Sequence, residues 1–224
     1  MRYYPIFLEL KDKNCLVVGG GPVGIRKALT LEKCGARVKV ISERFLQGTD
    51  GFSGTSIVFV EKKYEKKDIA GMFLVFASTN NADLNQEIKK DASASHILCN
   101  VADAPEQSDF LVPSTVDRGD LIVAISTSGT SPAMAKKIRQ DLEGFFDPAY
   151  ARVLCLMGNI RKKLLSSGHG PDEHRQAFSN LVDRDILELI RKEDDITINS
   201  ILHEIFGKGY IYQELVSGKG GMDE

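Results

Sequence analysis

The first residues that point to chemistry are three glycines, Gly19, Gly21 and Gly24, spaced as G-x-G-x-x-G. The apolar run of residues 15–19 leads into them, and a helical pattern follows over residues 22–34. In this setting the first glycine permits a tight turn, the second lets a pyrophosphate approach the backbone, and the third lets the helix pack against the strand. The N–H groups at the helix start would bind the phosphates. The context therefore favours dinucleotide binding over a glycine-rich turn without a ligand.

The end of the strand predicted over residues 37–42 bears on which dinucleotide binds. Folds of this kind often place Asp or Glu there to accept hydrogen bonds from the adenosine ribose. In this chain Ser42 ends the strand, and Glu43 and Arg44 follow. Glu43 favours NAD through the ribose hydroxyls, and Arg44 favours NADP through a 2′-phosphate. Surface charge accounts for either residue equally well, so the residues alone leave the choice between NAD and NADP open.

Two further strand ends carry polar side chains. Ser78, Thr79 and Asn80 lie at the end of the strand predicted over residues 72–79, and Asp103 follows the strand predicted over residues 96–102. The carboxyl ends of parallel strands line the ligand crevice, where the first three residues would donate to a cofactor phosphate or ribose. Thr79 or Asn80 could equally cap the next helix. Asp103 could serve as a general base or cap the turn of residues 103–107, and spacing alone favours neither role.

The elements that must position these residues alternate between strands and helices. Strands are predicted over residues 6–10, 15–19, 37–42, 55–62, 72–79 and 96–102, and helices over residues 22–34 and 82–95. Alternation of this kind, with continuous apolar runs in the strands, predicts a parallel sheet with helices on both faces. We therefore expect an α/β, Rossmann-like domain over residues 1–112.

The pattern changes in the second half of the chain. Residues 110–127 contain two β-rich runs about a polar turn, which predicts a hairpin. Residues 128–146 form a Ser/Thr/Gly loop that enters a helix, with Ser131 as a natural N-cap and Pro132 at the first helical position. Only helical patterns follow from about residue 149, and the last eight residues are expected to fray.

Composition limits the class of protein. The 224 residues are 42% hydrophobic and 27% charged with a net charge of -2, which fits a packed core and lacks the positive field that nucleic acid attracts. The chain has no apolar run of about 18 residues and no signal-peptide pattern at its start. The four cysteines form no CxxC pair, and their apolar neighbours predict buried free thiols in a reducing cytoplasm. We expect no resident metal, no nucleic acid and no membrane.

Residues 99–132, CNVADAPEQSDFLVPSTVDRGDLIVAISTSGTSP, resemble the precorrin-2 dehydrogenase and sirohydrochlorin ferrochelatase family, which also forms the N-terminal module of siroheme synthases. The opening YPIFLELKDKNCLVVGGGPVGIRKALTL and the helix AMAKKIRQDLE match it too, so the resemblance covers at least residues 3–145. It implies an oxidoreductase that converts precorrin-2 to sirohydrochlorin with NAD. In several members the same site acts as a lyase that inserts Fe²⁺ to give siroheme. It also implies a homodimer, with residues 113–147 as dimerisation segment and a helical domain over residues 148–224 completing the substrate cleft.

The resemblance also assigns residues to the site. The family's important aspartate corresponds to Asp103, which favours the general base over the turn cap. Its NAD contacts correspond to Pro22 and Val23 in the glycine-rich turn and to Glu43 and Arg44, which favours NAD. The predicted cofactor site as a whole comprises Gly19, Gly20, Gly21, Pro22, Val23, Gly24, Glu43, Arg44, Ser78, Thr79 and Asn80.

The implied substrate is a tetrapyrrole with eight carboxylates, so it needs positive charge and backbone donors. The loop of residues 126–131 opens a helix and can present N–H groups to a carboxylate. The predicted substrate site comprises Arg118, Ser126, Thr127, Ser128 and Gly129. Two alternatives stay open: a dehydrogenase without chelatase activity, and a non-catalytic NAD-sensing Rossmann regulatory domain. The sensor domains lack the NVADAP…VPSTVDRGDL segment that this chain carries.

Overall fold

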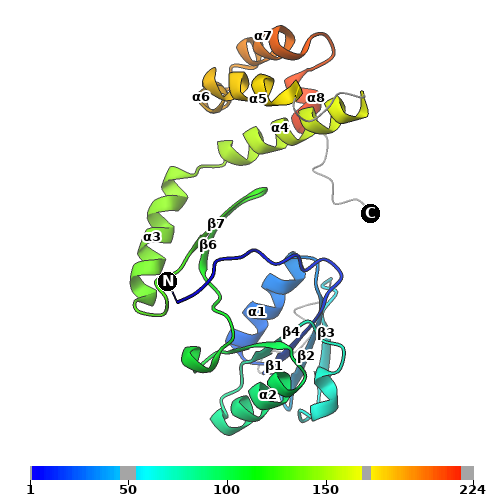
Figure 1. The fold of residues 1–224 in the computed structure, drawn as a ribbon, viewed down its shortest axis with the longest axis vertical. Coiled ribbons are helices and arrows are strands. Elements are labelled where there is room, and N and C mark those ends of the chain that lie inside the picture. The colour runs from blue at the N-terminus through cyan, green and yellow to red at the C-terminus, as the bar shows by residue number, and fades with distance from the viewer. Residues whose placement is uncertain (1, 46–53, 168–172, 218–224) are drawn as a thin grey trace. The chain divides into compact units, whose positions relative to one another are not determined.

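The computed structural model describes residues 2–45, 54–167 and 173–217. The chain divides into two compact units (Figure 1). Unit 1 comprises Met1–Val112 with Ser128–Thr130, and unit 2 comprises Pro113–Thr127 with Ser131–Glu224. The expected division into residues 1–112, 113–147 and 148–224 stays a prediction, and the expected frayed end, residues 217–224, lies almost wholly outside the described residues.

Unit 1 is built on a five-stranded parallel sheet with the strand order β3-β2-β1-β4-β5. The strands are β1 (Asn14–Val18), β2 (Arg37–Ser42), β3 (Val58–Glu61), β4 (Leu74–Ala77) and β5 (Leu98–Val101). From β1, the strands β2 and β3 follow one another toward one edge of the sheet, and β4 and β5 lie on the other side of β1. The sheet therefore has its topological switch point between β1 and β4, where folds of this kind bind ligands.

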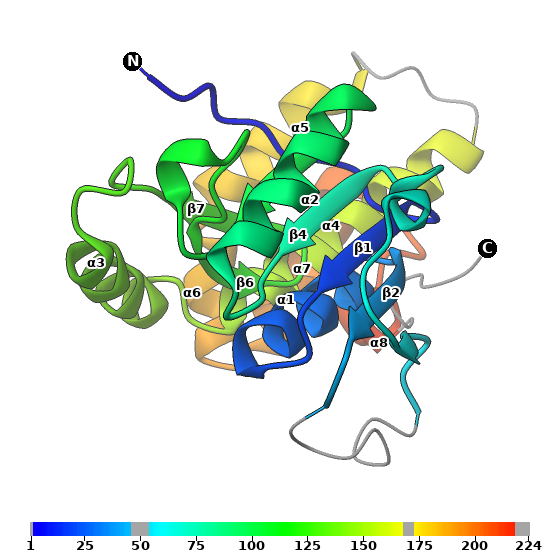
Figure 2. The same ribbon diagram turned by 90° about the horizontal axis from the view of Figure 1, so that it is seen from below.

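Helices α1 (Pro22–Lys33) and α2 (Ala82–Ala94) cover opposite faces of this sheet (Figure 2). Ala28 and Leu31 of α1 belong to one buried cluster, which includes alternate residues of β1 such as Cys15 and Val17. Ile88 of α2 belongs to a second cluster with the intervening β1 residues. Both faces of the central strand are thus buried, as its continuous apolar run requires. The expected Rossmann-like α/β fold is confirmed.

The strand predicted over residues 6–10 is wrong. Residues 4–10 have no regular secondary structure, and Ile6 and Phe7 are 60% and 71% exposed. Pro5 lacks the backbone N–H that a ladder needs, and β3 and β5 form the two edges of the sheet. Residues 4–10 pair with neither edge strand, so their apolar pattern alone does not make a strand.

Unit 2 begins with the predicted hairpin, in which β6 (Ser114–Arg118) pairs antiparallel with β7 (Leu121–Ile125). Helix α3 (Pro132–Phe145) packs on this hairpin, and its N-cap is Ser131, whose Oγ accepts from Met134 N at 3.2 Å. The remaining helices gather together (Figure 1): α4 (Ala149–Ser166), α5 (Glu173–Asp183), α6 (Ile186–Arg191), α7 (Asp195–Phe206) and α8 (Tyr212–Ser217).

Helices α4 to α8 of unit 2 share one hydrophobic core. Leu156 and Ile160 of α4 are fully buried in it, together with Leu181 of α5, Ile190 of α6 and Leu202 of α7. Apolar residues at helical spacing on each element supply this core, as the sequence pattern predicted. Among the described helices, none combines the length and the apolar character needed to cross a bilayer.

The cysteines are only partly as expected. Cys15 and Cys99 are buried, and burial raises the pKa of each thiol to about 11. Cys155 is half-buried, whereas Cys34 is exposed at the end of α1. The prediction that all four are buried is therefore wrong for Cys34, because an apolar neighbourhood in sequence does not show which side of a helix end faces solvent.

Candidate functional site

The turn between β1 and α1 is held so closely that a side chain at either of two glycines would clash with backbone atoms. Gly19 has φ +122°, and a Cβ there would lie 2.3 Å from the backbone oxygen of Ser78. A Cβ at Gly24 would lie 2.1 Å from the backbone oxygen of Gly19. The positive φ of Gly19 fits the tight turn predicted for the first glycine, and the close approach at Gly24 fits the helix packing predicted for the third. A Cβ at Gly21 would meet nothing within 4 Å, so that side of the turn is open to a ligand.

The start of α1 offers backbone donors. Gly21 is the N-cap and supplies no side-chain hydrogen bond, Pro22 occupies the first turn, and the first turn holds no acidic residue. The partial positive charge of the helix N-terminus is therefore not neutralised by a carboxylate within the turn itself. Val23 is 41% exposed at the same helix start. Gly20 faces the end of β2 instead, where a Cβ would lie 2.8 Å from Ser42 Oγ.

Ser78 supplies a further group that fits a bound dinucleotide. It follows β4, its N–H donates to Val18 O at 2.8 Å, and its side chain is buried. Its Oγ has no hydrogen-bond partner among the described residues. A buried hydroxyl without a partner is unusual and is of the kind that a ligand atom satisfies. Three features together fit a dinucleotide: the open side at Gly21, the start of α1 without a side-chain cap, and this hydroxyl.

The residues after β2 form a short turn. Ser42 Oγ donates to Arg44 O at 2.6 Å and lies 3.4 Å from Arg44 N. Glu43 and Arg44 are both exposed. Either side chain can reach a ligand from this position, so the preference for NAD over NADP stays a prediction.

The segment after β4 differs from expectation in its helix cap. The N-cap of α2 is Asn81, whose Oδ1 accepts from Leu84 N at 3.1 Å, so the prediction that Thr79 or Asn80 caps this helix is wrong. Thr79 instead turns to Asn85: its N–H and its Oγ1 donate to Asn85 Oδ1 at 3.2 and 2.7 Å. A capping asparagine two residues further on leaves Thr79 and Asn80 in the loop at the strand end.

Asp103 lies on the loop after β5 and is exposed. Asn85 Nδ2 donates to its Oδ1 at 3.0 Å. The next turn, residues 105–107, has Ala104 as its N-cap and no side-chain cap, so the alternative that Asp103 caps it is wrong. The loop is fixed at its far end, because Asp109 Oδ2 accepts from Cys99 N at 2.8 Å.

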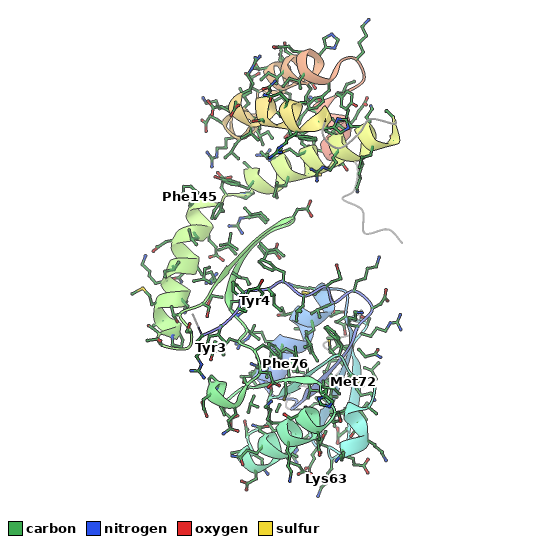
Figure 3. All side chains as sticks on the ribbon, in the orientation of Figure 1. Tyr3, Tyr4, Lys63, Met72, Phe76 and Phe145 are labelled. Atoms are coloured by element: carbon green, nitrogen blue, oxygen red, sulfur yellow. The ribbon has the colours of Figure 1, made fainter. Side chains whose placement is uncertain are left out.

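Sequence reasoning missed two residues of this region, Asn85 and Lys27. Lys27 of α1 donates from Nζ to Asn100 Oδ1 at 3.0 Å and lies 5.0 Å from the ring centroid of Phe76, which is labelled in Figure 3. Burial lowers the pKa of the Lys27 ammonium, and nearby Arg26 lowers it further. A signal existed, since Lys27 lies three residues after Gly24 and four before Leu31, on the buried side of α1.

The predicted substrate residues already make contacts within the protein. The Arg118 guanidinium donates to Phe146 O at 2.6 Å, Glu143 O at 3.0 Å and Asp117 O at 2.8 Å. It therefore holds the last carbonyls of α3, which leaves two of its five N–H groups for other partners. Thr127 Oγ1 lies 3.0 Å from Ser131 O and accepts from Ser131 N at 3.2 Å.

The loop before α3 also contains two left-handed residues, Ser128 with φ +55° and Gly129 with φ +83°. Ser126 precedes them, directly after β7. The assignment of this loop and of Arg118 to the substrate stays a prediction.

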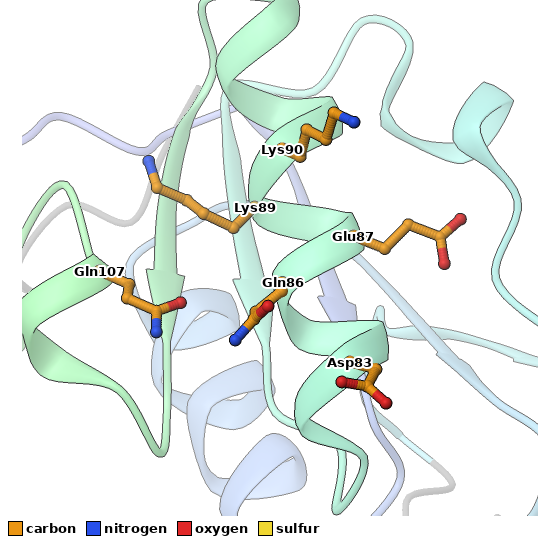
Figure 4. Close-up of a pocket in the computed structure, with 6 residues that line it drawn as sticks. All are labelled: Asp83, Gln86, Glu87, Lys89, Lys90 and Gln107. Atoms are coloured by element: carbon orange, nitrogen blue, oxygen red, sulfur yellow. The ribbon is translucent and has the colours of Figure 1, made fainter.

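A depression of about 660 Å³ lies elsewhere in unit 1, on the outer side of α2 (Figure 4). Its lining residues are Asp83, Gln86, Glu87, Lys89, Lys90 and Gln107. None of the predicted site residues lines it. Within residues 2–45, 54–167 and 173–217, no cluster of three or more His, Cys, Asp or Glu side chains could hold a metal ion.

Two family models match consecutive parts of the chain. The first, described as "Putative NAD(P)-binding", matches residues 6–114, and the second, described as "Sirohaem biosynthesis protein central", matches residues 118–144. Together they cover more than half of the chain. The first supports a nicotinamide cofactor for unit 1.

Curated relatives named siroheme synthase match over most of this chain. The protein of Vesicomyosocius okutanii is 35% identical over 82% of this chain and 38% of its own length. That of Nitrosococcus oceani is 31% identical over 96% and 46%, and that of Escherichia coli O157:H7 is 36% identical over 84% and 41%. The chain thus spans less than half the length of these relatives.

A solved structure, "SirC, precorrin-2 dehydrogenase", shares the fold. It aligns with a TM-score of 0.67 and 24% identity, over 85% of this chain and 100% of its own. At this identity the likeness supports the architecture of the chain.

Proposed function

Since this chain belongs to the siroheme synthase family, we propose that it is an enzyme that oxidises precorrin-2 to sirohydrochlorin, with a nicotinamide dinucleotide as the hydride acceptor. The observation that carries the proposal is the placement of Asp103. An exposed carboxylate follows β5, next to β4, and β4 in turn adjoins the glycine-rich turn after β1. A candidate base and a candidate dinucleotide site therefore lie at neighbouring strand ends of one sheet.

The chemistry needs both parts. Oxidation removes two electrons and two hydrogens from the tetrapyrrole, one as hydride and one as proton. The oxidised nicotinamide, when bound, accepts the hydride. Asp103 takes the proton onto its carboxylate and releases it to solvent, which regenerates the base. Backbone N–H groups at the start of α1 and the Ser78 hydroxyl would bind the dinucleotide.

We also propose NAD as the natural cofactor, with Glu43 accepting hydrogen bonds from the ribose hydroxyls. The alternative is NADP, with Arg44 meeting the 2′-phosphate. Dissociation constants for NAD⁺ and NADP⁺ decide between them. If NAD is the cofactor, we expect NAD⁺ to bind more tightly than NADP⁺ and Glu43→Ala to lose that preference. Tighter binding of NADP⁺, abolished in Arg44→Ala, would reverse the assignment.

The proposal is tested by anaerobic incubation with precorrin-2 and NAD⁺, with NADH absorbance and the tetrapyrrole spectrum followed together. We expect turnover by the native chain and a fall of about 10²–10⁴-fold in Asp103→Ala, the range for loss of a general base. Glu106→Ala is the matched control, because Glu106 is an exposed acid of the same loop. Normal turnover by folded Asp103→Ala would remove Asp103 from this role, and NAD⁺ binding without any turnover would favour a sensor domain.

Iron insertion and the homodimer stay predictions of the resemblance, and the cytoplasmic location stays a prediction from the cysteines. The chelatase is assayed with sirohydrochlorin and Fe²⁺ in the absence of NAD⁺. Siroheme formation above the uncatalysed rate supports a bifunctional enzyme, and its absence leaves a dehydrogenase only.

A further inference from the structure

Asn85 of α2 has an environment that a surface helix residue lacks. Its side chain is 1% exposed and lies between the loops that follow β4 and β5. The helix does not need this side chain for its start, because Asn81 provides the cap. A buried amide is costly unless its donors and acceptors are satisfied, so its hydrogen bonds show what holds it there.

All four hydrogen-bonding positions of the Asn85 amide are used. Oδ1 accepts from Thr79 N at 3.2 Å and from Thr79 Oγ1 at 2.7 Å, while Nδ2 donates to Thr79 O at 3.1 Å and to Asp103 Oδ1 at 3.0 Å. Two donors and two acceptor sites are the whole capacity of an amide. One planar group therefore joins the loop of Thr79 to the carboxylate of Asp103.

The fourth bond differs from the other three. Three bonds fix the loop between β4 and α2, whereas the bond to Asp103 reaches an exposed carboxylate on another loop. A hydrogen bond to an exposed group adds little to stability, but it sets the orientation of the carboxylate plane. The bond to Asn85 engages Oδ1, so Oδ2 would be the oxygen that takes the proton.

We propose that Asn85 is a positioning residue: it orients the Asp103 carboxylate for proton removal and ties it to the Thr79 loop of the predicted cofactor site. This inference rests on the proposed function, because it gives Asp103 the role of base. Hydride and proton leave the same substrate, so the base and the hydride acceptor must hold a fixed relation. A rigid amide between their two loops provides that relation.

The variant Asn85→Asp tests this. It keeps an oxygen to accept from Thr79 N and Oγ1, and it removes the donor to both Asp103 Oδ1 and Thr79 O. We expect kcat for precorrin-2 oxidation to fall at least about tenfold, since small misplacements of a catalytic group are costly. The KM for precorrin-2 and the dissociation constant of NAD⁺ should stay within about threefold. Asn81→Asp is the matched control: it makes the same change on the same helix, retains a capping oxygen, and should retain full activity.

A double-variant cycle separates positioning from a general structural effect. If Asn85 acts through Asp103, adding Asn85→Asp to Asp103→Ala causes no further fall in the residual rate. An equal fold-loss in both backgrounds overturns the inference, as does normal kcat in Asn85→Asp while Asp103→Ala is impaired. Full activity in Asp103→Ala itself would instead overturn the proposed role of the base.

A second measurement applies even if Asn85→Asp does not fold. Asp103 is exposed, so Asp103→Ala should fold, and its Asn85 side-chain amide can be observed by ¹⁵N NMR. Loss of the carboxylate should shift the Nδ2 resonances and speed the solvent exchange of one amide proton. Unchanged resonances and exchange would show that the two side chains are not bonded in solution, and the inference would fail.

Discussion

An added methyl group should affect mainly stability at Gly24 and mainly NAD⁺ binding at Gly21. At Gly24 a Cβ would lie 2.1 Å from the backbone oxygen of Gly19, whereas at Gly21 it would meet nothing. We therefore expect Gly24→Ala to lower the free energy of unfolding by about 1–3 kcal/mol, the usual cost of overpacking. Gly21→Ala should cost less stability, because only the N-cap preference for glycine is lost. It should weaken NAD⁺ binding, because its methyl group occupies the space into which a pyrophosphate would fit.

Urea unfolding and NAD⁺ titration, each on both variants, check this prediction. The two variants control for each other, since both replace a glycine of the same turn by alanine. If Gly21→Ala binds NAD⁺ as tightly as the native chain, the dinucleotide does not approach the turn at that residue.

Lys27 gives the fold a pH dependence whose sign follows from its lowered pKa. Below that lowered pKa, Lys27 is charged in the folded and the unfolded chain, and its burial opposes folding. Between it and the ordinary value of 10.5, the folded chain has released a proton that the unfolded chain still holds, so stability from this residue rises with pH. With rising pH, the unfolding free energy of the native chain should therefore increase relative to that of Lys27→Met.

Urea unfolding of both proteins between about pH 8 and pH 10 measures this shift. Cys15 and Cys99, whose raised pKa values give a dependence of the opposite sign, are present in both proteins and cancel in the difference. A difference that is constant across this range would show that Lys27 is not desolvated in solution.

These residues also show what the sequence could reveal of the site. The glycine positions were predictable because a close backbone approach admits one residue type. Asn85 was not, because a polar residue on a helix is usually solvated, and only the packed structure shows that this amide lies between two loops. Asp103 was placed at a strand end by pattern, and its role came from the family resemblance.

At the scale of elements, α3 depends on a residue outside it. Arg118 of β6 donates to the carbonyls of Glu143 and Phe146, where the helix ends without a glycine cap. We expect Arg118→Met to lower the free energy of unfolding by about 2 kcal/mol, because hydrogen bonds from a charged donor are lost and the carbonyls lose their partners. Lys136→Met, on the exposed side of α3, is the matched control and should change stability by less than about 0.5 kcal/mol.

Chemical denaturation of the three proteins measures both effects, and precorrin-2 turnover on the same samples tests the predicted substrate role. A stable Arg118→Met protein with a raised KM would assign Arg118 to the substrate. Loss of stability with an unchanged KM would assign it to α3.

The elements themselves were largely predictable, with a physical reason for each exception. Continuous apolar runs identified β1 and β4 because both of their faces are buried, and Ser131 identified the start of α3 because few residue types cap a helix. Residues 6–10 misled because a strand also needs a partner, which local sequence does not contain. The cap of α2 was displaced by one residue from Asn80 to Asn81, within the usual uncertainty of helix ends.

At the scale of the whole molecule, the two units have separate hydrophobic cores. The buried cluster around Leu156 contains only residues of unit 2, and the cluster around Leu74 contains only residues of unit 1. The change from alternating strands and helices to purely helical patterns predicted the two kinds of architecture. Sequence patterns report burial along each element, so they do not report how separate units sit relative to each other.

Separate cores predict that damage to one unit spares cofactor binding by the other. Leu156→Ala should cost unit 2 about 2–5 kcal/mol, the range for a fully buried leucine. Saturating NAD⁺ should still protect the turn after β1, and at about 100 times its dissociation constant this protection is worth about 2.7 kcal/mol. Leu74→Ala makes the same change in unit 1 and should reduce that protection. Hydrogen exchange measured for separate peptides, with and without NAD⁺, reports the protection of each unit. Faster exchange throughout both units in Leu156→Ala would show that the two units unfold together.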